Sequence, residues 1–116
     1  MKFSYPIQLQ QAVDALRTRP GTCSPELRQS IEAYAAQKSV GAREARPIPA
    51  ELVKYVDKVT LNAYKITDED VQQLRTAGYS EDAIFEITLC ASVGASLARM
   101  DRGLKALEAS HALTNS

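Results

Sequence analysis

Residues 80–107 read SEDAIFEITLCASVGASLARMDRGLKAL, and this stretch decides the fold. From Ile84 to Ala98 nearly every position is apolar or small, apart from Glu86 and a few hydroxyl side chains. A helix of this composition is typical of the centre of a protein or of a subunit interface. The spacing of the apolar residues predicts one helix over about 80–107, followed by a flexible tail over 111–116.

Small side chains follow one face of this helix and allow another backbone to approach closely. They are Ala91, Gly94, Ala95 and Ala98. We expect this small-residue stripe to pack against a partner subunit. Beyond Arg99 the apolar pattern narrows to Met100, Leu104 and Leu107, which predicts a more exposed end.

Two capping patterns locate the starts of the last two helices. Thr67 followed by Asp70 resembles a capping box, and the acidic residues 68–70 suit the positive end of a helix dipole. Gly78 supplies the left-handed residue that ends this short helix, and Ser80 then caps the long one. The sequence therefore predicts a short helix joined to the long helix by a tight turn.

Three further helices are expected upstream, over about 6–19, 24–41 and 49–63. Ser24 and Pro25 are typical of a helix start, because the hydroxyl caps free amides and proline fits the first turn. The pattern as a whole predicts an all-α protein of about five helices, with the long C-terminal helix at its centre.

The segment between residues 39 and 47 is charged and lacks apolar periodicity, so it marks the best internal boundary. At 116 residues the chain is expected to fold as a single domain over 1–116. We divide that domain into an N-terminal helical pair and loop over 1–46 and a helical core over 47–110, with the tail behind it.

The composition excludes several function classes. Lys plus Arg and Asp plus Glu both number 14, so no net field attracts nucleic acid or an anionic membrane. The turn before the long helix resembles a helix-turn-helix, but the next helix opens with Glu81 and Asp82, which do not suit a DNA groove. The longest uncharged run, 87–98, is too short to cross a bilayer, so we expect a cytoplasmic protein without membrane or nucleic-acid partners.

Metal and disulfide sites are not indicated either. The two cysteines, Cys23 and Cys90, are far apart, and the only histidine, His111, is in the predicted tail. This spacing matches no zinc site and no disulfide framework, so no cofactor is expected.

The stretch from about Val56 to Leu107, with the words AYKITDEDVQQLRTAGYSEDAIFEITL and ASLARMDRGL, resembles the C-terminal half of the alkylhydroperoxidase D-like and carboxymuconolactone decarboxylase family. The resemblance implies an all-helical scaffold that assembles as dimers, trimers or hexamers. Redox members of that family carry two cysteines separated by two residues, with a histidine shortly after. This sequence has no such element, so the resemblance carries over a scaffold and no catalytic residue.

Three residues remain as weak catalytic candidates: Glu86, Cys90 and Arg99. Glu86 and Cys90 are four residues apart and project from one helix face, as a base and a nucleophile would. A carboxylate nevertheless keeps a neighbouring thiol protonated, so a structural role is favoured, with Glu86 reaching solvent or paired to an arginine such as Arg75. Arg99 is expected to close an ion pair on a neighbouring helix or subunit, with anion binding as the alternative.

Two functions follow from these observations. The favoured one is a non-redox, self-associating helical protein that serves as a binding or structural component, with a homo-oligomer as its expected state. The alternative is an enzyme, either a thiol peroxidase that uses Cys90 or a lactone or decarboxylase-type catalyst in which Glu86 and Arg99 converge in a pocket.

Overall fold

A computed structural model describes residues 6–41 and 46–114. Within these ranges the chain is helical and contains no strand. The elements are α1 (Ile7–Thr18), α2 (Pro25–Ser39), α3 (Ala50–Leu61), the 3-10 turn η1 (Ala63–Lys65), α4 (Asp68–Thr76) and α5 (Glu81–Thr114). The predicted all-α class, the five helices and the long C-terminal helix are confirmed.

The predicted helix caps are observed with their hydrogen bonds. The Ser24 hydroxyl accepts the Leu27 amide at 3.1 Å, and the Ser80 hydroxyl accepts the Ala83 amide at 3.1 Å. Thr67 and Asp70 form a complete capping box. Lys58 of α3 donates to Asp70 at 2.8 Å, and the pKa of that carboxyl falls to about 2, mainly because of this bond. The box thus also ties α4 to α3.

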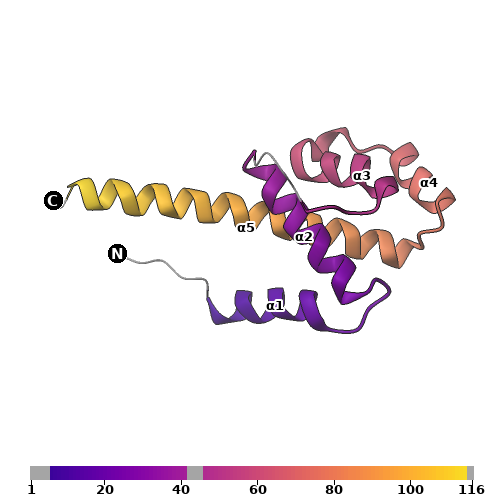
Figure 1. Ribbon diagram of the computed structural model, residues 1–116, viewed down its shortest axis with the longest axis horizontal. Coiled ribbons are helices and arrows are strands. Elements are labelled where there is room, and N and C mark those ends of the chain that lie inside the picture. Colours follow the sequence, from indigo (N-terminus) through magenta and orange to yellow (C-terminus); the bar gives the residue numbers. More distant parts are fainter. Residues whose placement is uncertain (1–5, 42–45, 115–116) are drawn as a thin grey trace.

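Helix α5 forms the axis of the fold, and α2 crosses it (Figure 1). Their contact is tight because Gly94 lies against the α2 backbone: a Cβ added there would stand 2.2 Å from the Glu32 carbonyl oxygen. Ala91 and Ala95 of the same face are buried. The prediction that this small-residue stripe packs on a partner subunit is therefore wrong, because α2 of the same chain already occupies it.

The core lies between α2, α3, α4 and the first half of α5. It is built from apolar residues of all four helices, with Ile31, Leu52, Val56 and Ile87 among the largest that are fully buried. Helix α1 packs mainly on α2, and Figure 1 shows it on the same side of the molecule as the middle of α5.

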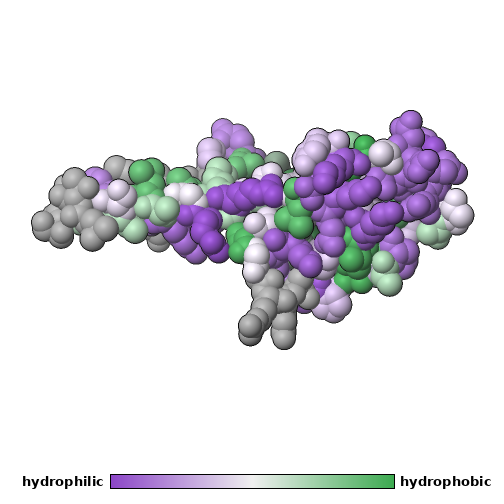
Figure 2. Space-filling model, turned by 90° about the horizontal axis from the view of Figure 1, so that it is seen from above, coloured by the Kyte–Doolittle hydropathy of each residue, from purple (hydrophilic) through white to green (hydrophobic). Residues whose placement is uncertain are grey.

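The second half of α5 extends beyond this core. The helix continues past its predicted end at Leu107 to Thr114, which corrects the expected flexible tail over 111–114, while residues 115–116 lie outside the described part. The molecule is accordingly elongated, with extents of 57 × 28 × 23 Å. Among the described residues, Figure 1 shows no other helix beside this projecting segment, and Figure 2 shows apolar surface on it among hydrophilic residues.

Candidate functional site

Glu86 holds the connection between α1 and α2 against α5. Its carboxylate accepts the backbone amides of Thr22 at 2.8 Å and Cys23 at 3.3 Å. Gly21 leaves room for it, since a Cβ there would stand 2.4 Å from Glu86 Oε1. Three successive residues of the connection therefore fit around one carboxylate, which gives Glu86 a positioning role in the fold.

The arginine that faces Glu86 is Arg28, so the predicted pairing with Arg75 is wrong. Arg28 Nε lies 3.9 Å from Glu86 Oε1, and the Arg28 side chain is 4% exposed. Arg75 instead pairs with Glu81 at 2.6 Å on the surface. Arg75 is nearer to Glu86 in the sequence, but the packing of α2 on α5 places Arg28 beside Glu86 instead.

Arg28 is a structural residue that sequence reasoning missed. Its guanidinium donates to the carbonyls of Leu16, at 2.7 Å, and of Arg19, where α1 ends. A buried cation at the C-terminal end of a helix satisfies carbonyls that lack partners inside the helix. The available signal was its position on the apolar face of α2, three residues before Ile31.

Both thiols are buried. Burial raises the pKa of the Cys90 thiol to about 12, and Cys90 is 1% exposed. Burial, followed by the charge of Glu86, also raises the pKa of Cys23, whose thiol donates to the Ala83 carbonyl at 3.6 Å. Thiol peroxidase chemistry requires an accessible thiolate, so neither environment favours it.

Arg99 is placed far from Glu86. Its guanidinium donates to the carbonyl of Thr60 at the C-terminal end of α3, rather than to a carboxylate of another helix in the described chain. The two residues are separated by thirteen positions of one helix, or about 20 Å. They share no pocket, and Arg99 acts as a clamp between α5 and α3.

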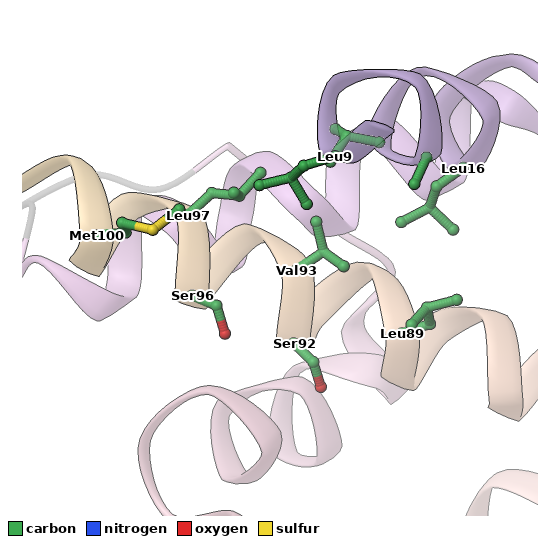
Figure 3. A pocket seen from close by; sticks show the side chains of 10 residues that line it. Leu9, Leu16, Leu89, Ser92, Val93, Ser96, Leu97 and Met100 are labelled. Atoms are coloured by element: carbon green, nitrogen blue, oxygen red, sulfur yellow. The ribbon is translucent and has the colours of Figure 1, made fainter. Parts of the chain in front are cut away.

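An apolar groove of about 430 Å³ lies between α1 and α5. None of its lining residues carries a charge: they are Leu9, Ala12, Val13, Leu16, Leu89, Ser92, Val93, Ser96, Leu97 and Met100. Figure 3 shows Val93 and Leu97 of α5 pointing toward α1, where Leu9 and Leu16 form the opposite wall. Among the described residues that line the groove there is no acid, base or thiol, and the apolar walls are suited to an apolar group.

No cluster of three or more His, Cys, Asp or Glu side chains suits a metal ion in the part of the chain that the structure describes. By length and composition, the helix over 81–112 could cross a membrane, and 39% of its most apolar window is buried inside the protein.

Comparison with known proteins adds no assignment: no family model, curated protein or solved structure matches this chain. The described residues form an elongated helical protein with an uncharged groove, and the functional proposal rests on that geometry.

Proposed function

We propose that this chain is a self-associating helical protein, built on the alkylhydroperoxidase D-like scaffold, that serves as a binding or structural component without thiol redox chemistry. A cytoplasmic location is part of the proposal, since reducing conditions suit two unpaired cysteines. The scaffold assignment is supported by the order of the capped α4, the Gly78 turn and the apolar α5, which carries Arg99.

The observation that carries the proposal is the projecting half of α5. Met100 is 40% exposed and Leu107 is 52% exposed, although both lie on one side of a helix that is otherwise the core of the fold. Apolar side chains that gather on one exposed face are typical of protein interfaces. A second copy of the chain is the partner that we propose for this face.

The enzyme alternative has less support. It requires either a reactive Cys90 thiolate or a pocket shared by Glu86 and Arg99. Cys90 is buried as a thiol, while Glu86 and Arg99 hold different segments of the backbone.

Two measurements test the proposal. Size-exclusion chromatography with light scattering is expected to show a dimer or larger assembly at high micromolar concentration, and a monomer there would refute self-association. Peroxide consumption with a dithiol donor is expected to equal the buffer rate for the parent, Cys23→Ser and Cys90→Ser proteins. Consumption by the parent that Cys90→Ser abolishes would establish the peroxidase instead.

A further inference from the structure

The exposed surface of the chain is larger than a monomer of its size requires. Its accessible area is 7559 Å², about 1,300 Å² more than expected for a monomeric protein of 12.7 kDa. The radius of gyration, 16.0 Å, compares with about 13 Å for a compact domain of this length. Stable interfaces cover about 800 Å² or more on each partner, so the excess is large enough to supply one dimer contact.

The apolar residues on the outer face of α5 follow a heptad spacing. Val93, Leu97, Met100, Leu104 and Leu107 are separated alternately by four and three positions. We call these five residues the α5 seam. Such spacing keeps apolar side chains along one line over several turns, as in helices that pair side by side.

The α5 seam runs without interruption from the groove into the projecting segment. Val93, Leu97 and Met100 line the groove, and Leu104 and Leu107 lie beyond it (Figure 3 shows the first three). A helix that follows the seam along the projection therefore reaches the α1–α5 groove. The chain thus carries both a projecting apolar helix and an apolar groove. Two copies related by a two-fold axis can each place the helix in the groove of the other.

An antiparallel arrangement fits the spacing. We place the two-fold axis between the two helices, level with position 102 along each of them. Met100 then lies opposite Leu104 of the partner subunit, and Leu97 lies opposite Leu107 of the partner subunit. Four of the five seam residues, Leu97, Met100, Leu104 and Leu107, then meet an apolar residue, while Val93 lies opposite His111 of the partner subunit. The projecting end of each helix enters the groove of the other chain.

Small residues flank the seam where the two helices would be closest. Ser96, Gly103 and Ser110 recur every seven positions on one side of it. A Cβ added at Gly103 would meet nothing within 4 Å, so no contact among the described residues of the single chain requires this glycine. Glycine inside a helix lowers stability by about 1 kcal/mol relative to alanine. The close approach of a second helix would explain why glycine stands at position 103.

We infer that two chains form an antiparallel, two-fold symmetric dimer through the α5 seam, and this inference rests on the self-association proposed above. In the dimer, each projecting helix fills the α1–α5 groove of the other chain. The occupant of the groove is thus the Leu104–Leu107 segment of a second copy. No charged residue lines the groove, and the flanking Asp101 pairs with Lys105 of its own helix at 3.0 Å.

Cross-linking tests the position of the axis. In the dimer, Gly103→Cys places two thiols close together at the axis, whereas Arg102→Cys, one residue away, directs them outward. With oxidised glutathione as oxidant, Gly103→Cys is expected to form a disulfide-linked dimer at least about tenfold faster than Arg102→Cys. Equal rates would overturn the inference.

Charge exchange tests the direction of pairing. Met100→Lys and Leu104→Glu each bury an unpaired charge, so each variant alone is expected to dissociate about a hundredfold more readily than the parent. An equimolar mixture is expected to recover dimers, because Lys at 100 faces Glu at 104 across the antiparallel interface. A parallel pair would place neither charge opposite the other, so failure of recovery would overturn the inference.

The outcomes separate this inference from the proposed function. A parent protein that is monomeric by light scattering refutes both. A parent that is dimeric or larger, but shows equal cross-linking rates or no recovery in the mixture, keeps self-association and removes the α5 seam as its interface. Binding of the monomer to anionic vesicles, with apolar residues of α5 inserted, would assign this face to a lipid surface instead.

Discussion

Glu86 accepts two backbone amides of the α1–α2 connection while it faces the buried Arg28. A carboxylate so placed stabilises the folded chain, because it satisfies amides outside any helix and balances a cation removed from water. The same contacts explain why a pairing of acid and thiol that looks catalytic in the sequence has no chemical role here.

We expect Glu86→Gln to lower the free energy of unfolding by about 1–3 kcal/mol, since the amide keeps the size of the side chain but loses the charge opposite Arg28. Urea unfolding measures this as a lower midpoint at unchanged slope. Glu81→Gln, which removes the exposed partner of Arg75, is the control and should change stability by less than about 1 kcal/mol. Equal losses in the two variants would contradict the role given to Glu86.

For Glu86 the sequence left two alternatives, contact with solvent or pairing with an arginine such as Arg75, and it did not indicate Arg28. Arg75 is nearer along the chain, whereas Arg28 arrives only through the crossing of α2 and α5. The caps at Thr67 and Ser80 were predictable because their partners lie within three residues. Contacts between residues distant in sequence depend on packing, which local patterns do not encode.

Helices α2 and α5 touch backbone to backbone at Gly94, so their crossing tolerates no added atom. Ala91 and Ala95, on the same helix face as Gly94, are buried, and their small side chains keep the two helices close along the rest of the contact. The close approach itself was predicted from these small residues. Its partner was not, because a small-residue face suits a helix of the same chain as well as one of another subunit.

Gly94→Ala is expected to destabilise the protein by about 1–3 kcal/mol, because the Cβ must push the Glu32 carbonyl and α2 away. Thermal unfolding at one fixed protein concentration checks this. Ser92→Ala, two residues away on an exposed face of the same helix, should be neutral or slightly stabilising, since alanine favours the helix. A stable Gly94→Ala protein would show that the α2–α5 contact is looser than described.

The whole molecule combines a compact core with a helix that extends out of it. The fold class and the long helix were predictable from periodicity and composition. The groove was not, because it arises where α1 stands away from α5, and that spacing depends on how the α1–α2 connection is held by Glu86 and Arg28.

If the native state is a dimer, thermal stability must depend on protein concentration. A hundredfold increase in concentration is expected to raise Tm by roughly 5 °C, from the entropy of unfolding of two chains of this length. Calorimetry over that range measures the shift. In Leu104→Glu the Tm should no longer vary with concentration, and a parent whose Tm is constant would argue for a monomeric native state.

Because α5 is continuous from Glu81 to Thr114, the direction in which its outer half faces is set by the packing of its inner half. Inserting one residue between Arg99 and Gly103 would leave the core intact and rotate everything beyond it by about 100°. Inserting seven would restore the facing direction and lengthen the rod by about 10 Å. Changes in chain length at this point could thus alter which surface is presented without touching the fold.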